Sequence, residues 1–282
     1  MHPNTQPQQL INEGKLGAAL TALQDLVRKD ASNAKYRNFL FQLLCVMGQW
    51  NRALTQLKVA GDLDPLSLPM VQTYREAIQC EALRKDIFSG ARAPLIFGEP
   101  APWLGLLLDA LRRDAAADHA GAAAARAQAF ELAPAGAGSI DGVRFEWIAD
   151  ADQRLGPVLE AVVNGRYFWI PMQHIRRIEL EAPVDLRDVV WCPASFTWTN
   201  GAQTVGLIPT RYEGTLESGD DALLMARRTE WDGEGAEVSR GLGQRMLVTD
   251  VGDHALMDVR LIEFDADPAP EVADPAGNDQ HG

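Results

Sequence analysis

Apolar residues recur at helical spacing through the first half of the chain, from about Leu10 to Leu132. Two stripes are clear: Leu16, Ala19, Leu20, Leu23, Leu26 and Val27, and then Tyr36, Phe39, Leu40, Leu43, Leu44 and Met47. Spacings of three and four residues place each stripe on one face of an α-helix. The same pattern predicts a third helix over 67–88 and a helix pair over 103–133. Three prolines over 92–102 forbid helix there and predict a connector.

The first two helical stretches are related by an offset of 34 residues. Six pairs keep their character at this offset: Gly14/Gly48, Leu16/Trp50, Ala19/Ala53, Leu20/Leu54, Leu23/Leu57 and Asp30/Asp64. This is the period of tetratricopeptide (TPR) repeats, in which each repeat is a helix pair that buries its apolar face against its neighbours. The pattern predicts a curved stack of helices, which is typical of a protein-binding surface.

After Gly142 the apolar spacing shifts toward two, which is typical of strands. We expect strands over 143–148, 166–170, 175–181, 203–208, 245–250 and 255–264. Two helices are expected between them, one after Asp152 that stops at Asn164-Gly165, and one announced by the capping sequence Ser218-Gly-Asp-Asp221.

The sequence therefore predicts a two-domain α+β protein. A disordered N-terminus over 1–9 precedes a TPR-like α-α superhelix over 10–133. A glycine-rich linker over 134–142 leads to a mainly antiparallel, β-rich α+β domain over 143–264. The segment 265–282 is acidic, contains three prolines and no Lys or Arg, and is expected to be a disordered tail.

Charge and composition narrow the function classes. The net charge of −13 is uneven, because residues 1–133 hold 14 basic and 13 acidic residues (+1), which leaves 12 basic and 26 acidic (−14) for the rest. An acidic second half makes nucleic acid an unexpected partner. No apolar run reaches the roughly 18 residues of a membrane span, and residues 1–9 lack the features of a secretory signal. We expect a cytoplasmic protein without membrane insertion.

The densest polar cluster is Trp147-Ile-Ala-Asp-Ala-Asp-Gln-Arg-Leu-Gly-Pro157. Asp150 and Asp152 could act as a general acid/base or metal pair. Alternatively, one aspartate caps the helix expected near Leu155 and the other is held by Arg154. We favour this structural interpretation, because neither a histidine nor a third ligand stands nearby. No cofactor is expected, since the chain lacks a P-loop, and the scattered cysteines Cys45, Cys80 and Cys192 provide no metal-ligand spacing.

Several polar residues have weaker alternatives. Lys35, Asn38 and Gln42 fall on the inner face of a repeat helix, where they could hold the backbone or carboxylate of a bound peptide or could simply be solvated. Gly241-Leu-Gly243 is expected to form a hairpin turn. Ser195 is expected to be a turn residue, because it lacks the flanking glycines of a nucleophile elbow.

Four motifs in the second half together resemble one family. They are Trp147-x-Ala-Asp-Ala-Asp-x-Arg-Leu-Gly-Pro157, Pro183-x-Asp-Leu-Arg-Asp-x-x-Trp-x-Pro-Ala194, Ile208-Pro-Thr-Arg-Tyr212, and Gly243-Gln-Arg-x-Leu-x-Thr-Asp-x-Gly252 running into Asp258-Val-Arg-x-Ile-Glu-Phe264. Together with the helical-repeat half that precedes them, these motifs resemble the ImpE/TagJ (SciE-type) accessory proteins of bacterial type VI secretion. The resemblance covers roughly residues 10–265. The chain departs from the family at Tyr212-Glu-Gly-Thr, where Tyr-Pro-Gly-Ser is expected.

The resemblance implies a cytoplasmic, non-catalytic accessory protein that contacts the small sheath subunit TssB and the AAA+ ATPase ClpV. The candidate partner-binding residues are those of the repeat face and of the motifs: Lys35, Asn38, Gln42, Trp147, Asp150, Asp152, Arg154, Arg211, Tyr212 and Arg245. Two alternatives stay open at this point. One is a metal-assisted hydrolase that uses Asp150 and Asp152, and the other is a TPR-type adaptor outside secretion.

Overall fold

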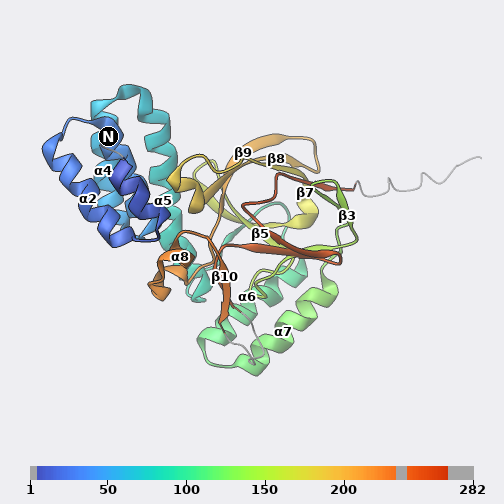
Figure 1. Cartoon of the computed structure of the whole chain (residues 1–282). Helices are drawn as coiled ribbons and strands as arrows, with labels where there is room; N and C mark the ends of the chain where they lie inside the picture. Colours follow the sequence, from blue (N-terminus) through green and yellow to red (C-terminus); the bar gives the residue numbers. More distant parts are fainter. Residues whose placement is uncertain (1–4, 233–239, 266–282) are drawn as a thin grey trace, which may run out of the picture.

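The computed structural model describes residues 5–232 and 240–265, with helices first and strands afterwards (Figure 1). The helices are α1 (Thr5–Asn12), α2 (Leu16–Lys29), α3 (Ala34–Val46), α4 (Trp50–Leu63), α5 (Leu68–Phe88), α6 (Pro102–Ala115), α7 (His119–Leu132) and the short α8 (Asp221–Leu224). Four 3₁₀ turns complete the helical elements: η1 (Pro65–Ser67), η2 (Met172–His174), η3 (Leu186–Val189) and η4 (Thr215–Ser218).

The 34-residue offset of the sequence recurs in the structure. Gly14 (φ +72°) follows α1 and Gly48 (φ +65°) follows α3, so each glycine takes the left-handed conformation that ends a helix at low cost. The next helices, α2 and α4, bury Ala19 and Ala53 completely. The small side chains allow the close contact between α1 and α2 and between α3 and α4.

The second half is a mainly antiparallel sheet of nine strands in the order β1-β6-β5-β9-β8-β7-β14-β2-β3, in which only β1 and β6 run parallel. Its strands are β1 (Leu95–Ile96), β2 (Gly138–Ile140), β3 (Val143–Phe145), β5 (Val158–Val163), β6 (Arg166–Pro171), β7 (Ile175–Leu180), β8 (Trp191–Trp198), β9 (Gln203–Pro209) and β14 (Leu261–Phe264). Two small sheets contain β4 (Ile148–Asp150), β12 (Met246–Thr249) and β13 (Gly252–Ala255), and β10 (Thr229–Asp232) with β11 (Arg240–Gly243). The expected α+β fold class is confirmed.

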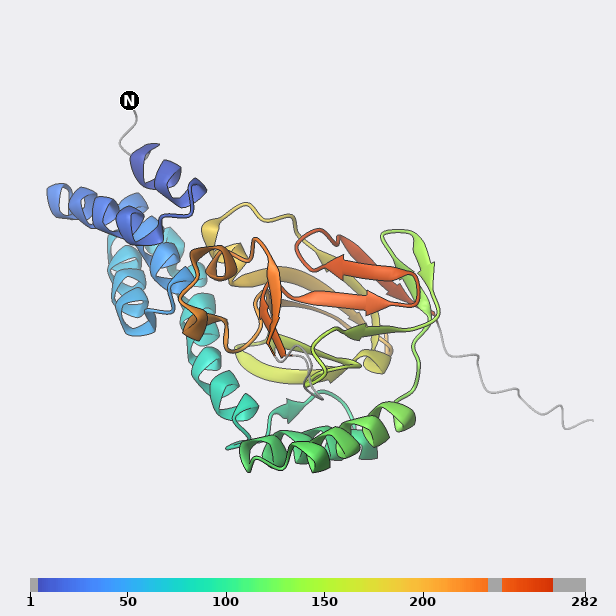
Figure 2. The ribbon, with the colours of Figure 1, turned by 60° about the horizontal axis from the view of Figure 1, so that its bottom comes forward.

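The two halves share one hydrophobic core. Trp191 on β8 packs against Trp50 of α4 and Tyr74 of α5, with ring centroids 5.9 and 5.7 Å apart. The Trp191 indole also donates to Glu81 Oε1 of α5 (2.9 Å). Figure 2 shows α5 (cyan) running beside the strands and α7 (green) lying below them in that view. A second apolar cluster fills the face of the sheet turned away from α5.

The helix expected after Asp152 is wrong, because Val158–Val163 forms β5. Every residue of β5 is buried. Val158 and Val162 pack toward the helices, whereas Leu159 and Val163 pack into the second cluster. A strand buried on both faces shows no alternation of apolar and polar residues, so its apolar run can be mistaken for a helix.

The expected turns at Ser195 and at Gly241–Gly243 are also wrong. Ser195 lies in β8, a strand that the sequence analysis missed, and it pairs with Val205 of β9. The strand was missed because it contains Pro193, and proline is unusual within a sheet. Gly241 and Gly243 belong to β11.

The ends and the linker differ from the prediction in part. Residues 5–9, expected to be disordered, belong to α1, and residues 138–140 of the expected linker form β2, which pairs with β14. Asp265 is described and its carboxylate pairs with Arg144, whereas residues 1–4 and 266–282 of the expected disordered ends lie outside the described residues. Among the described residues, no helix is both long and apolar enough to cross a membrane.

Candidate partner-binding groove and buried ion-pair network

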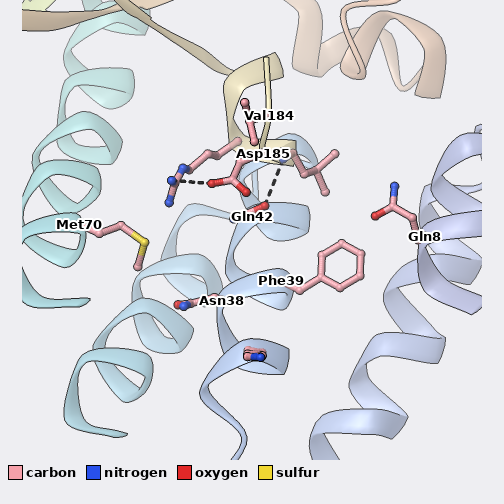
Figure 3. Close-up of a pocket in the computed structure, with 10 residues that line it drawn as sticks. Gln8, Asn38, Phe39, Gln42, Met70, Val184 and Asp185 are labelled. Carbon is pink, nitrogen blue, oxygen red and sulfur yellow. Dashed lines mark hydrogen bonds and ion pairs between the residues drawn. The ribbon is translucent and has the colours of Figure 1, made fainter. Parts of the chain in front are cut away.

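A groove lies between the N-terminal helices and a loop of the sheet half (Figure 3). Its volume is about 610 Å³. The helical wall is formed by Gln8 of α1, Lys35, Asn38, Phe39 and Gln42 of α3, and Met70 of α5. The structure thus brings Lys35, Asn38 and Gln42 together on one face of α3, as their spacing predicts.

The opposite wall is the segment Val184–Arg187, which joins β7 to β8 and is called the strap below. The backbone N–H of Leu186 donates to Gln42 Oε1 (3.2 Å). The Arg187 guanidinium stacks on the Tyr74 ring of α5, 4.7 Å from its centroid. One polar residue of the helical face therefore already binds a peptide backbone that comes from the same chain.

The strap is held in shape by its own hydrogen bonds. Asp188 Oδ2 accepts from the backbone N–H groups of Val184 and Asp185 (both 2.8 Å), and Asp185 in turn caps η3. Thr210 Oγ1 donates to the carbonyl of Asp188 (2.9 Å). The strap is consequently a preformed wall of the groove.

Away from the groove, a network of buried charges joins α5 to the sheet. Its centre is Glu160 of β5, which is fully buried. Arg84 Nε of α5 donates to Glu160 Oε1 (2.6 Å), and Arg245 and the hydroxyl of Tyr167 also donate to this carboxylate. The Trp169 indole donates to the Tyr167 hydroxyl (2.9 Å) and so helps to hold that hydroxyl beside the carboxylate.

Arg245 links this centre to the Trp147–Pro157 motif. Its guanidinium also contacts Asp150, and Tyr212 donates to Asp150 Oδ1 (3.0 Å). The Tyr212 hydroxyl in addition accepts from the backbone N–H of Met246 (2.9 Å). Three of the motifs noted in the sequence therefore meet at one buried point.

Asp152 and Arg154 form the next part of the network. Arg154 Nη2 donates to Asp152 Oδ2 (2.6 Å), and Gly241 N–H donates to the same oxygen (3.0 Å). The expected pairing of an aspartate with Arg154 is confirmed, but the pair closes a turn between β4 and β5. Glu213, the charge that departs from the family pattern, lies 3.6 Å from Arg154 Nη1.

Arg211 has a different environment. Its Nη1 donates to the carbonyls of Val46 and Leu224 (both 2.7 Å), which stand at the C-terminal ends of α3 and α8. Helix C-termini carry partial negative charge and stabilise a cation there. Burial lowers the pKa of Arg211 to about 10. Arg211 therefore fastens the helical half to the sheet half.

The two central carboxylates respond differently to burial. Burial raises the pKa of Asp150 to about 6, and the attraction of Arg245 does not offset this. Burial acts on Glu160 in the same direction, but Arg84 and Arg245 outweigh it and lower the pKa of Glu160 to about 2. Glu160 is thus the firmly ionised member of the network.

Most predicted motif residues are therefore internal. Asp150, Asp152, Arg154, Arg211, Tyr212 and Arg245 are each at most 6% exposed. In this conformation they cannot contact a partner directly. Of the motif residues predicted to bind a partner, Trp147 alone is exposed, at 40%.

The geometry does not favour a metal or acid/base pair at Asp150 and Asp152. Both carboxylates are already engaged by Arg245, Arg154 and backbone N–H groups. Among residues 5–232 and 240–265, no group of three or more His, Cys, Asp or Glu is arranged to hold a metal ion.

Sequence reasoning missed Arg84, Glu160 and Tyr167. Glu160 stands within the apolar run Val158–Val163, and an isolated charge in such a run was the signal available for a buried ion pair. Its partner Arg84 lies 76 residues away on α5, which no local pattern reveals.

Comparisons of the sequence and the fold with known proteins found a matching family, a related protein and a similar solved structure. Residues 142–263 match the ImpE protein family. The type VI secretion system accessory component TagJ of Pseudomonas aeruginosa is 54% identical over 258 residues, which cover 92% of this chain and 90% of that protein. The crystal structure of a protein from Vibrio parahaemolyticus is similar with a TM-score of 0.84 and 26% identity, over 93% of this chain and 98% of that one.

Proposed function

The chain belongs to the ImpE family, and on this premise we propose that it is a non-catalytic accessory component of a type VI secretion system. It acts by binding other proteins, and its partners are the sheath subunit TssB, the ATPase ClpV, or both. By holding them it modulates sheath assembly or disassembly.

The observation that carries the proposal is the 54% identity to TagJ over 92% of the chain. Identity at this level, spread over both halves, favours a shared role as well as a shared fold. The groove supports a binding role, because it exposes polar and apolar side chains between two walls that are already ordered.

The test is retention of purified partners on a column that carries the full chain. We expect TssB or a ClpV fragment to be retained at moderate salt and to be eluted by excess free chain. A folded chain that retains neither protein would refute the proposal. The tryptophans of the shared core, Trp50, Trp169 and Trp191, report folding by fluorescence in the same sample.

The hydrolase alternative has its own test. Calorimetry with calcium or manganese should give no binding heat, since the carboxylates of Asp150 and Asp152 are engaged. Binding that Asp150→Asn abolished would revive that alternative.

A further inference from the structure

A second cavity lies between α5 and the segment that follows β9, and it shares no lining residue with the groove described above. Figure 1 shows the segment that carries η4 and α8 (orange) beside α5, and the Lys85 ammonium of α5 pairs with Glu217 of η4. The cavity has a volume of about 400 Å³. Sites for small molecules in proteins have volumes of about 300–1,000 Å³.

Arg211 lines this cavity and is a buried cation without a counter-charge. It is 5% exposed, and no carboxylate in residues 5–232 and 240–265 lies within ion-pair distance of its guanidinium. Nη1 donates to two carbonyls, but Nε and Nη2 have no acceptor among the same residues. Burial lowers the pKa of Arg211 to about 10, and the attraction of Glu81 does not offset this.

Arg84 adjoins Arg211 in the wall of the cavity, since its Nη2 donates to the backbone carbonyl of Arg211 (2.8 Å). Nε and Nη2 of Arg84 bind Glu160, whereas the carboxylate nearest to Nη1 is that of Glu81, 3.7 Å away and beyond hydrogen-bond distance. None of the three nitrogens without an acceptor is sealed from solvent within the described part of the chain. Two neighbouring guanidinium groups therefore offer N–H donors to one cavity.

The carboxylates that line the cavity do not neutralise Arg211, because each has a cation of its own within 4 Å. These pairs are Glu217 with Lys85 (2.7 Å), Glu213 with Arg154 (3.6 Å) and Glu81 with Arg84 (3.7 Å). The carboxylate of Glu81 also accepts from the Trp191 indole (2.9 Å). The charge that is left without a partner at this cavity is therefore positive.

We propose that the cavity binds a phosphate group, either as the free ion or as part of a small molecule. Nε and Nη2 of Arg211 form the side of the guanidinium that donates to two oxygens of one phosphate. Nη1 of Arg84 donates to a third oxygen. Two adjacent guanidinium groups favour a doubly charged phosphate over a singly charged carboxylate, since each charge of the ligand then has a cation beside it.

The site goes beyond the proposed binding of other proteins and does not depend on it. Arg211 also binds the carbonyls of Val46 and Leu224 at the ends of α3 and α8. A ligand held by Arg211 and Arg84 therefore binds only where the helical half and the sheet half are packed together, and it stabilises that packing by mass action.

The experiment is calorimetric titration of the full chain with inorganic phosphate, glycerol 3-phosphate and acetate at one ionic strength. Thermal unfolding is measured with the same three ligands. The matched variants are Ala82→Glu and Ala82→Gln, because Ala82 is an exposed residue of α5 that lines the cavity. They differ in charge alone and leave both arginines in place. A third variant, Glu217→Gln, removes a lining carboxylate that is 56% exposed.

We expect both phosphates to bind the wild type and Ala82→Gln and to raise the unfolding temperature. Ala82→Glu should weaken this binding about tenfold, because the new carboxylate repels the ligand and competes for the arginines, and acetate should bind about tenfold more weakly than phosphate. Glu217→Gln should strengthen phosphate binding. Tighter binding of glycerol 3-phosphate than of inorganic phosphate would identify an organic phosphate as the ligand, and the reverse order would identify the free ion.

Three results would overturn the inference. One is the absence of both binding heat and a shift in unfolding temperature with either phosphate. Another is equal affinity of folded Ala82→Glu and Ala82→Gln, and the third is acetate binding as tight as that of phosphate. Retention of TssB or ClpV on the column is scored separately, so these results leave the proposed function untouched.

Discussion

The sharpest structural prediction concerns Glu160, and the substitution is Glu160→Gln. The carboxylate is fully buried and receives hydrogen bonds from Arg84, Arg245 and Tyr167. Glutamine keeps the size of the side chain and one acceptor oxygen but removes the negative charge. The one carboxylate that Arg84 then keeps among the described residues is Glu81, 3.7 Å away, and the one that Arg245 keeps is Asp150.

The magnitude follows from two ways of describing the same buried ion pairs. Removal of one partner from a buried ion pair costs about 3–5 kcal/mol, because the remaining charge stays desolvated. The pKa of Glu160 falls from an ordinary 4.5 to about 2, which corresponds to about 3 kcal/mol of folding stability at neutral pH. We therefore expect Glu160→Gln to lower the free energy of unfolding by about 3–4 kcal/mol at pH 7.

The assay is guanidinium unfolding of the full chain, followed by tryptophan fluorescence, because Trp169 donates to Tyr167 beside Glu160. The matched control is Glu179→Gln, which removes a carboxylate that is 56% exposed and paired with Arg177 on the surface. An exposed pair of this kind contributes only about 0–1 kcal/mol.

The pH dependence has a definite sign. A glutamate with a lowered pKa in the folded state stabilises the protein fully above pH 4.5, and this stabilisation is lost as the pH falls toward 2. The difference in unfolding free energy between wild type and Glu160→Gln should therefore shrink over this range. A difference below about 1 kcal/mol at pH 7, or one that grows on acidification, would refute the reasoning.

Three further predictions follow from the same structure. Asp150 has a folded pKa raised to about 6, so its charge opposes folding as the pH rises from 4 to 6; unfolding curves of Asp150→Asn should lose that slope, and an unchanged slope would contradict the assignment. Gly243→Ala should lower the free energy of unfolding by at least about 2 kcal/mol more than Gly142→Ala does, as measured by thermal unfolding. Both glycines have φ near +82°, but a new Cβ would lie 2.2 Å from the carbonyl oxygen of Arg228 at Gly243 and would meet no atom within 4 Å at Gly142. Asn38→Leu should raise the free energy of unfolding by about 1 kcal/mol, since it removes a buried acceptor that has no partner among the described residues; a destabilised variant would indicate a structural bond instead.

The helical half could be predicted closely because its signals are local. The 34-residue offset placed Gly14 and Gly48 at helix ends, and the structure gives both a positive φ. Glycine is favoured in this conformation whatever surrounds it. The face that holds Lys35, Asn38 and Gln42 also followed from helical geometry alone.

The sheet half was less predictable, for reasons of environment. β5 is buried on both faces and β8 contains Pro193, so neither strand shows the alternation that identifies a half-buried strand. The motif residues were predicted to bind a partner, but six of them are buried and have a structural part in the fold. Sequence cannot distinguish a buried carboxylate from an exposed one, because the distinction depends on which distant arginine arrives beside it.

The sequence by itself determined the order of a helical and a β-rich half, the repeat spacing and, through four motifs, the family. Each is written in short-range patterns of residue type, and such patterns act through local backbone preference and amphipathic spacing. The tertiary structure alone decided that Arg84 neutralises Glu160 across 76 residues, and that the strap closes the groove beside Gln42. These contacts depend on how the two halves pack around Trp191, and packing is a property of the whole chain.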